Sequence, residues 1–366
     1  MSHAQPKDSD LRQDVLDAVA RRVPHRIPYT YNAREETDRA FRDHLGLTDK
    51  QTIEEVYRCN RFTSPWSVIG GRWHVPGRGR GRSGDDEMVD LWGCRRVKTP
   101  YEGGYYYELA EPPLAGARTV ADIEAYDWPD PSEIVWPELP ENIDLEQART
   151  DVVVNCMDFI CPFGIPWAMR GMENLMTDVA LNPAIVECMV EKVEQFTLAA
   201  MTEMFRRYPG VVDLVGCGDD YGTQISLFLS KDMIDRFFMP SLTRHYEVAA
   251  RHGAAGYHHC CGAIVPIIPS FIEAGVKVLN PIQTSATGMD PAFLKKEFGQ
   301  HLCFHGSIDI QQTLVTGTPA EVRDEVKDRI DTLGPEGFIL APSHVLQPDT
   351  PVENLQALYD AAVEFC

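Results

Sequence analysis

From residue 151 to the C-terminus, short runs of β-branched and apolar residues alternate with longer amphipathic segments of helical period. The expected strands cover residues 152–159, 211–217, 255–261, 276–281, 302–308 and 337–342. The expected helices cover residues 183–207, 231–252, 319–333 and 352–365. Such alternation is typical of repeated strand–helix units that build a parallel sheet. Because 366 residues suffice for one enlarged barrel of eight such units, we expect an α/β fold of the (β/α)8 TIM-barrel type.

The first 150 residues have a different texture, because glycine and proline interrupt their apolar runs, as in the stretch YDWPDPSEIVWPELPEN. We expect residues 1–150 to form an N-terminal extension or cap that packs on a barrel made by residues 151–366. Residues 27–31, followed by a helical segment, could supply a seventh strand. The sequence does not identify the eighth.

The charge of the chain restricts its partners. There are 34 basic and 55 acidic side chains, a formal net charge of -21, which disfavours binding to nucleic acid or to an anionic membrane surface. The sequence has no apolar run of about 18 residues and no apolar signal region at its start. Ten cysteines in such a chain are typical of a reducing compartment. We therefore expect a cytoplasmic enzyme that acts on a small molecule.

Polar side chains follow the expected strands at their C-terminal ends, where a barrel of this type places its active site. These residues are Asp158, Asp219, Asp220, His259, Cys261, Gln283, Asp309, His344 and Gln347. If the strands form one barrel, side chains from distant parts of the sequence converge at one mouth. These residues are therefore the first candidates for a catalytic site.

The segment GYHHCCGAI has the most informative spacing in the chain. In a strand, residues i and i+2 point to the same side, so His259 and Cys261 face one way together. Nitrogen and thiolate ligands at this spacing suit zinc. His258 and Cys260 have the same spacing, however, and either pair could instead be ordinary packing residues. Our candidate for a third ligand is His344, which could equally hydrogen-bond a substrate.

Asp219 and Asp220, in the segment GCGDDYG, are candidates for acid and base catalysis or for holding a cationic group. A helix cap or a hydrogen-bonded turn would explain the same pair without any catalytic role. The sequence leaves both interpretations open.

The C-terminal half resembles the uroporphyrinogen-decarboxylase-like superfamily, over roughly residues 151–365. The resemblance rests on the segments FICPFGIPW, GDDYGTQISLFLSKDMIDRFFMP, HHCCG, GVKVLNPIQTSATGMDPAFLKKEFG, FHGSIDIQ, GTPAEVRDEV and GFILAPSHVLQPDTPVENLQAL. This superfamily includes the haem-pathway decarboxylase and zinc-dependent methyltransferases of corrinoid systems. The resemblance therefore implies a barrel enzyme with one of these two chemistries.

The methyltransferase branch carries a His-x-Cys-Gly turn with two zinc ligands, which His259, Cys261 and Gly262 match. Its third ligand is a cysteine in a late Pro-Gly-Cys turn, where this chain has Pro342, Ser343 and His344. The decarboxylase branch has a histidine in that late turn, as here, but also an Arg-rich N-terminal motif that grips carboxylates. That motif is missing from this chain.

Our leading hypothesis is a zinc-dependent methyltransferase that moves a methyl group between a small methylated substrate, a corrinoid (cobalamin) carrier on a possible partner protein, and a thiol or tetrahydrofolate acceptor. The predicted metal ligands are His259, Cys261 and His344, the predicted catalytic residues are Asp219, Asp220 and His344, and the predicted substrate-binding residues are Asp158, Tyr221, Gln283, Asp309 and Gln347. The alternatives are a cofactor-free decarboxylase of uroporphyrinogen or another carboxylated substrate, and a non-catalytic protein that binds a corrinoid or porphyrin.

Overall fold

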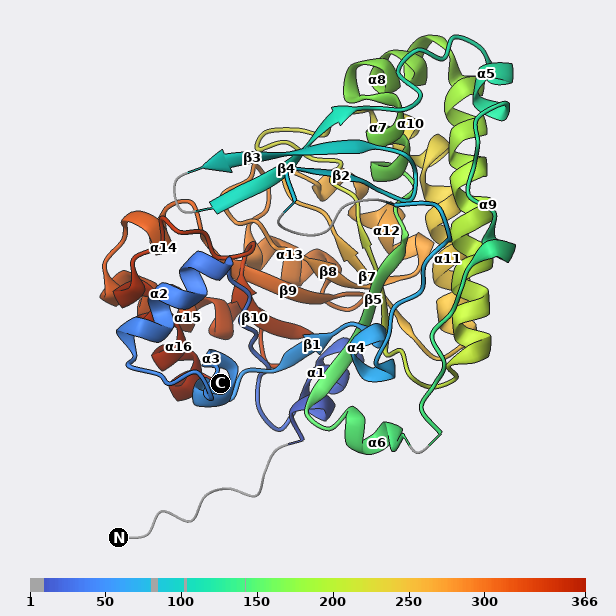
Figure 1. Cartoon of the computed structure of the whole chain (residues 1–366). Helices are drawn as coiled ribbons and strands as arrows, with labels where there is room; N and C mark the ends of the chain where they lie inside the picture. Colours follow the sequence, from blue (N-terminus) through green and yellow to red (C-terminus); the bar gives the residue numbers. More distant parts are fainter. Residues whose placement is uncertain (1–9, 80–84, 102–103, 142) are drawn as a thin grey trace, which may run out of the picture.

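The computed structural model describes residues 10–79, 85–101, 104–141 and 143–366. Its central element is a curled, seven-stranded sheet in the order β1-β5-β6-β7-β8-β9-β10, in which each neighbouring pair of strands is parallel (Figure 1). The strands are β1 (Arg61–Thr63), β5 (Val152–Ile160), β6 (Leu214–Gly218), β7 (Ala255–His259), β8 (Val276–Asn280), β9 (Cys303–Ile308) and β10 (Phe338–Pro342). The predicted α/β architecture with a parallel sheet is therefore confirmed.

All six strands predicted after residue 150 are present, from β5 to β10, with ends that differ from the prediction by a few residues. The helices α9 (Pro183–Arg207), α15 (Pro319–Leu333) and α16 (Val352–Phe365) also have the predicted bounds. The single helix predicted over residues 231–252 is instead two, α10 (Lys231–Phe237) and α11 (Met239–Arg251). Pro240 explains the break, since proline is tolerated in the first turn of a helix but not in its interior.

The two edges of the sheet are linked by the segment predicted as a seventh strand. Tyr29 forms a parallel bridge to Leu340 of β10, and Thr30 forms one to Asn60, which precedes β1. The Thr30 amide donates to the Leu340 carbonyl at 3.0 Å, and the Asn60 amide donates to the Tyr29 carbonyl at 2.8 Å. The segment over residues 27–31 therefore contributes two isolated bridges rather than a full strand, and both edges of the sheet meet it.

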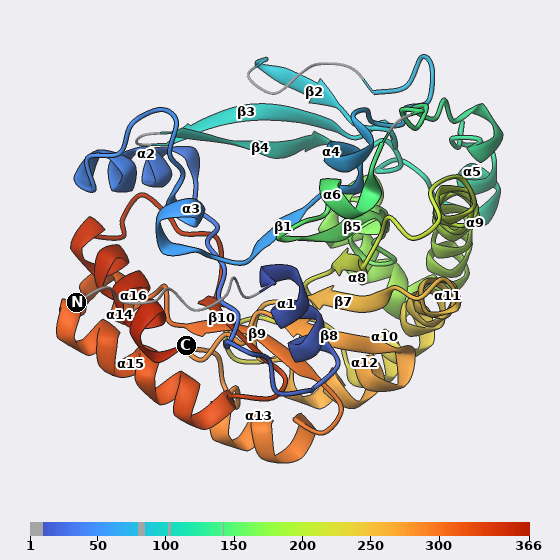
Figure 2. The same cartoon turned by 90° about the horizontal axis from the view of Figure 1, so that it is seen from below.

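An apolar layer fills the inside of the curled sheet at the end where the strands begin. Figure 2 shows the helix α1 (Leu11–Val19) at this end of the sheet. Its Val15, Ala18 and Val19 side chains belong to the layer. Each strand from β5 to β10 contributes one inward side chain, namely Val153, Leu214, Tyr257, Val278, Cys303 and Ile339. Such layers of inward residues, one from each strand, are the core packing of a TIM-like barrel.

Helices surround the outer face of the sheet (Figures 1 and 2). A second, larger apolar cluster joins buried residues of these helices to buried residues of the strands. The remaining helices are α2 (Glu35–His44), α3 (Ile53–Tyr57), α4 (Pro65–Ile69), α5 (Val120–Glu124), α6 (Leu145–Ala148), α7 (Gly164–Arg170), α8 (Met172–Leu181), α12 (Ile268–Ala274), α13 (Pro291–Phe298) and α14 (Thr313–Thr316), with 3-10 turns at Pro131–Glu133 and Val265–Ile267. No helix in the described part of the chain is both long enough and apolar enough to cross a membrane.

The N-terminal 150 residues also form a separate antiparallel sheet, which sequence reasoning did not predict. Its strands are β2 (Glu87–Val89), β3 (Arg95–Tyr101) and β4 (Gly104–Glu111), in the order β2-β3-β4. Because β1 from this half pairs with β5, the main sheet includes residues from both sides of position 150. The division into an extension and a barrel at that position stays a prediction.

A buried histidine lies inside the curled sheet, above the layer filled by α1. The two ring nitrogens of His305 hydrogen-bond to the Thr30 hydroxyl at 3.0 Å and to the Tyr257 hydroxyl at 3.1 Å, and its ring stacks on Phe62. Burial, helped by the nearby positive charge of His259, lowers the pKa of His305 to about 3. The folded protein therefore holds this histidine uncharged through the pH range in which an unfolded chain takes up a proton.

This burial predicts a pH-dependent stability. The depressed pKa of His305 stabilises the fold above the ordinary histidine pKa of 6.5, and that contribution is lost as the pH falls toward 3. The variant His305→Gln keeps polar groups but cannot titrate. As the pH falls from 6 to 4, its free energy of unfolding should therefore decrease less steeply than that of the wild type, and the two slopes should differ by about 1.4 kcal/mol per pH unit. Urea unfolding at several pH values measures this slope. The exposed His44→Gln is the control, and equal slopes for wild type and His305→Gln would contradict the prediction.

Candidate metal centre

Three potential ligands from two distant parts of the chain meet at the C-terminal ends of the strands. His259 is the last residue of β7, Cys261 follows two residues later, and His344 lies two residues beyond the end of β10. One ligand atom from each lies within 4.8 Å of the others. The Cys261 Sγ and His259 Nε2 atoms are 3.4 Å apart, and the two imidazole rings are edge to face. The sequence predicted this trio, and the fold brings its members together.

The structure decides which of the two His-x-Cys pairs faces the mouth. His258 is completely buried, and its ring centroid lies 4.2 Å from that of Phe271. Cys260 is also buried, and its sulfur accepts a hydrogen bond from the Tyr221 amide. The alternation of the strand thus points His258 and Cys260 away from the mouth, which leaves His259 and Cys261 as the pair that can bind a ligand.

A glycine fixes the turn that presents Cys261. Gly262 has a φ of +97°, a left-handed conformation that side chains rarely adopt. A Cβ atom at this position would lie 2.7 Å from the Gly222 carbonyl carbon and from the Thr223 carbonyl oxygen. The loop after β6 therefore packs directly against the turn after β7, and only glycine leaves room for this contact.

Asn280, at the end of β8, orients the His259 ring. The His259 Nδ1 and Asn280 Oδ1 atoms are 2.7 Å apart, and the Asn280 amide in turn donates to the His305 carbonyl at 3.1 Å. Since the amide oxygen can only accept, Nδ1 carries the proton and Nε2 presents its lone pair toward Cys261. This is the arrangement by which an outer partner prepares a histidine to bind a metal ion.

Removing that partner should weaken metal binding. We expect Asn280→Ala to lower zinc affinity by about 10- to 100-fold, the usual cost of losing a residue that orients a ligand. Competition with a chromogenic chelator measures the affinity. Asn280→Asp keeps an acceptor for His259 and should bind zinc about as well as wild type. If Asn280→Ala retains wild-type affinity, Asn280 does not have this orienting role.

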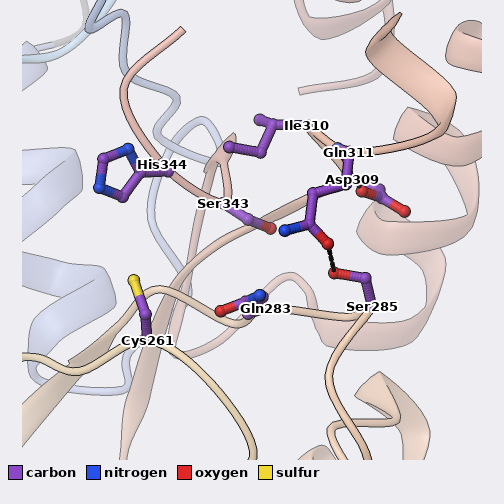
Figure 3. A pocket seen from close by; sticks show the side chains of 8 residues that line it. All are labelled: Cys261, Gln283, Ser285, Asp309, Ile310, Gln311, Ser343 and His344. Atoms are coloured by element: carbon purple, nitrogen blue, oxygen red, sulfur yellow. Dashed lines mark hydrogen bonds between the residues drawn. The ribbon is translucent and has the colours of Figure 1, made fainter. Parts of the chain in front are cut away.

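A cavity of about 220 Å3 opens beside the trio and has a polar wall (Figure 3). Its lining is Cys261, Gln283, Ser285, Asp309, Ile310, Gln311, Ser343 and His344. Gln283 accepts the Gly262 amide at 2.7 Å, and Ser285 donates to Gln311 at 2.9 Å. The cavity therefore offers a small polar substrate several hydrogen-bonding groups held in place by backbone and amide contacts.

A second cavity, of about 460 Å3, is lined in part by Asp220. Its lining is Asp90, Trp92, Arg96, Cys161, Phe163, Gly164, Ile165, Trp167, Ala168, Met172, Gly218, Asp220 and Phe228. Asp220 connects the two regions, because it lines this cavity and its carboxylate accepts the Cys261 amide at 2.7 Å. The antiparallel sheet contributes Arg96 from β3 and, from the turn between β2 and β3, Asp90 and Trp92. The site is therefore assembled from both halves of the chain.

The two neighbouring aspartates have different surroundings. Asp220 is exposed in the second cavity, whereas Asp219 is only 1% exposed and lines neither cavity. The Asp219 carboxylate accepts the amides of Phe163 and Gly164, each at 2.8 Å, and also contacts the Cys161 thiol and the Tyr221 hydroxyl. Burial raises the pKa of Asp219 despite these bonds. These contacts tie the end of β6 to the loop after β5.

The remaining candidates fall in several places. Gln283 and Asp309 line the smaller cavity, and the Asp309 carboxylate also accepts the backbone amides of Gln311 at 2.7 Å and Gln312 at 3.2 Å. Tyr221 is buried. Asp158 lines neither cavity and pairs with Arg72 at 2.8 Å. Gln347 also lines neither, and accepts a hydrogen bond at 2.8 Å from Tyr106 of β4. The substrate-binding roles of all five residues stay predictions.

Several residues of the site were missed by sequence reasoning. Asn280 carried a usable signal, because a polar residue at the end of an apolar strand in a barrel faces the mouth. Ser285 and Gln311 lie in loops after strands, and their positions in the sequence gave a weaker signal. For Trp92 and Arg96 there was no local signal, since only the packing of the antiparallel sheet places them beside Asp220.

One solved structure that is similar to this chain supports the fold. A solved structure of a methyltransferase from Methanosarcina mazei is 16% identical, with a TM-score of 0.63, and the match covers 98% of this chain and 99% of that one. A B12-independent methionine synthase from a Shewanella species is 11% identical, with a TM-score of 0.33, over 49% of this chain and 60% of that one. No curated protein matches the sequence. At these identities the first likeness supports the fold alone.

The family comparison extends further than structural likeness. The family model described as uroporphyrinogen decarboxylase (URO-D) matches residues 105–365, which is most of the chain. This span includes β5 to β10, the His259, Cys261 and His344 trio, and both aspartates at the end of β6. The chain therefore belongs to the uroporphyrinogen decarboxylase family.

Proposed function

We propose that this protein is a zinc-dependent methyltransferase that moves a methyl group between a small methylated substrate, a corrinoid carrier and a thiol or tetrahydrofolate acceptor. The observation that supports this proposal is the trio of His259, Cys261 and His344, with ligand atoms within 4.8 Å of one another at the mouth of the sheet. Family membership alone is compatible with either methyl transfer or decarboxylation.

The donor set fits zinc. Two imidazole nitrogens and one sulfur are ligands that zinc prefers, and three protein ligands leave a position open for a substrate atom. Burial, followed by the neighbouring Asp220 carboxylate, raises the pKa of the Cys261 thiol to about 12, so the thiol needs a bound cation to become a thiolate. When bound, zinc would act as a Lewis acid that lowers the pKa of an acceptor thiol. His259, Cys261 and His344 would hold it.

The other residues of the site have proposed roles that follow from their positions. Gln283 and Asp309 line the smaller cavity and would hydrogen-bond the acceptor. Asp220 would orient the methylated reactant or take up a proton, because its carboxylate faces the larger cavity beside Cys261. Asp219 would act indirectly, by holding the loop after β5, which lines the larger cavity.

The reaction balances as a transfer of a methyl cation equivalent. The acceptor thiol gives its proton to solvent or to a nearby base, and its sulfur supplies the electron pair of the new carbon–sulfur bond. With a methylated corrinoid as the donor, the carbon–cobalt bond would break and its electron pair would stay on the corrinoid, which would leave as the reduced carrier. The corrinoid would be presented by a partner protein.

A complete barrel is part of this proposal. The bridges from Tyr29 and Thr30 to the strands at both edges support an eighth position between β10 and β1. In such a (β/α)8 barrel the antiparallel sheet would lie over the mouth, as the hydrogen bond between Tyr106 and Gln347 and the lining by Trp92 and Arg96 suggest. The expected N-terminal cap would then shape the substrate site.

Decarboxylation of uroporphyrinogen has less support from the site. A substrate with many carboxylates needs several cationic groups to bind it. Among the residues that line the two cavities, Arg96 is the only arginine or lysine, and it lies beside Asp90. His344 matches the late-turn histidine of the decarboxylase branch, and Asp219 or Asp220 would stabilise a protonated ring, but the Arg-rich motif that grips carboxylates is missing.

Methyl transfer can be tested with purified protein, zinc, methylcobalamin and a series of thiols or tetrahydrofolate. We expect the protein to accelerate conversion of methylcobalamin to cob(I)alamin, followed by absorbance under anaerobic conditions, and to form a stoichiometric methylated acceptor. A parallel assay should show no release of carbon dioxide from uroporphyrinogen. If zinc-loaded protein accelerates none of the methyl transfers but releases carbon dioxide, the decarboxylase alternative replaces this proposal.

A further inference from the structure

The larger cavity has a wall of aromatic rings. Trp92, Phe163, Trp167 and Phe228 all line it, and they come from three segments of the chain, since Phe163 and Trp167 both belong to the start of α7. Rings of this kind provide apolar surface together with π faces that attract cations. The volume of about 460 Å3 suits a small molecule rather than a macromolecular segment.

The charges in this cavity leave one carboxylate without a cationic side chain. The Arg96 Nε atom lies 3.8 Å from Asp90 Oδ2, while Asp90 Oδ1 accepts the Trp92 and Cys94 amides, both at 2.9 Å. Asp90 and Arg96 therefore largely compensate each other. The groups that contact Asp220 belong to Cys261, and in the described part of the chain no lysine or arginine forms an ion pair with it. The cavity thus combines aromatic rings with a carboxylate that has no lysine or arginine partner among the described residues, although the His344 ring lies within electrostatic range of it.

We infer that the larger cavity binds a small quaternary ammonium compound, which would be the methylated reactant of the proposed methyl transfer. The fate of the methyl group in this inference rests on the proposed function, whereas the binding of the quaternary ammonium compound does not. Aromatic rings with a nearby carboxylate form the kind of site that recognises a quaternary ammonium group. Asp220 places the cationic end next to Cys261 because its carboxylate is hydrogen-bonded to the Cys261 amide.

The chemistry of such a reactant is consistent with the proposed transfer. When a methyl group leaves a quaternary ammonium, the electron pair of the broken carbon–nitrogen bond stays on nitrogen and gives a neutral tertiary amine. A reduced corrinoid supplies the electron pair of the new carbon–cobalt bond. At neutral pH this amine takes up a proton from solvent, so the product differs from the reactant by one methyl group and an N–H donor rather than by its charge.

Choline and 3,3-dimethylbutan-1-ol provide a direct test, because they have nearly the same shape. Choline has a positively charged nitrogen where the alcohol has a neutral carbon. Isothermal titration of the full-length protein should show choline binding at least about tenfold more tightly than the neutral alcohol. Equal affinities, or tighter binding of the alcohol, would overturn the inference and leave an apolar cavity. Binding of neither compound would overturn it as well.

Variants locate the binding. Asp220→Asn keeps an oxygen for the Cys261 amide but removes the charge, and Phe228→Leu keeps apolar volume but removes a ring. Each should reduce choline affinity several-fold and leave affinity for the alcohol nearly unchanged. Phe293→Leu is the matched control, since Phe293 is 42% exposed and Phe228 44% exposed, and Phe293 does not line the cavity. If all three variants bind choline like wild type, the compound binds elsewhere and the inference is wrong.

Binding is measured here without metal or turnover. A failure of choline to bind would leave the methyltransferase proposal intact, because zinc content and methylcobalamin conversion test it separately. Conversely, selective choline binding by a protein without methyltransferase activity would support the cavity assignment and overturn the proposed function alone.

Discussion

Replacing His259 by alanine and Cys261 by serine together should abolish zinc binding and methyl transfer. Both side chains reach the same point, with Nε2 and Sγ 3.4 Å apart, so the double variant leaves only His344 from the trio. Losing a residue that merely orients a ligand costs about 10- to 100-fold in metal affinity, and losing two direct ligands should cost more. Metal analysis of protein from zinc-supplemented cells, with the methylcobalamin assay, measures both effects.

A second double variant shows whether the loss is specific. His301→Ala/Cys188→Ser removes an exposed histidine and a half-buried cysteine outside the trio and should keep wild-type zinc and activity. Circular dichroism and thermal unfolding should show that both double variants remain folded. If wild type and His259→Ala/Cys261→Ser both carry negligible zinc after zinc-supplemented expression, the metal-dependent mechanism is wrong.

His344→Ala should lose zinc as well as activity, because His344 is the third member of the trio and the only one from the end of β10. Partial burial and the neighbouring positive charge of His259 lower the pKa of His344, which favours the neutral imidazole that binds metal. X-ray absorption of zinc-loaded wild type should show nitrogen ligands at about 2.0–2.1 Å. His344→Ala should lower the number of nitrogen ligands by one in any zinc that it retains.

His344→Cys provides the matched comparison. It replaces one zinc ligand with another, and we expect it to retain zinc with one more sulfur ligand at about 2.3 Å. If His344→Ala keeps full zinc but loses turnover, His344 contacts the substrate and only His259 and Cys261 remain as protein ligands. That result would favour the decarboxylase-like role for this residue and would contradict the three-ligand centre.

The strands and most of the long helices were predictable from the sequence. The apolar strands and the amphipathic helices α9, α15 and α16 have local signals, because burial on a sheet and on a helix face requires different residue periods. The break at Pro240 and the short strand β1 have weaker signals. The antiparallel sheet was missed, because glycine and proline around its strands obscure their alternation, and its pairing depends on contacts between strands.

For the site, the sequence by itself determined the residue types and their spacing. His259 and Cys261 are two residues apart at the end of a strand, so they had to share one side whatever the rest of the fold does. That spacing applied equally to His258 and Cys260, and only the packing of His258 against Phe271 settles which pair is buried. Local periodicity fixes the relation between neighbours but not which face meets the core.

The approach of His344 to that pair, and of Trp92 and Arg96 to Asp220, was decided by tertiary structure. His344 is more than eighty residues from Cys261, and their distance depends on how the curled sheet brings β7 and β10 to one mouth. Trp92 and Arg96 depend on how the antiparallel sheet packs near the end of β6. Contacts of this kind depend on the sum of many side-chain interactions between elements, and no short stretch of sequence records that sum.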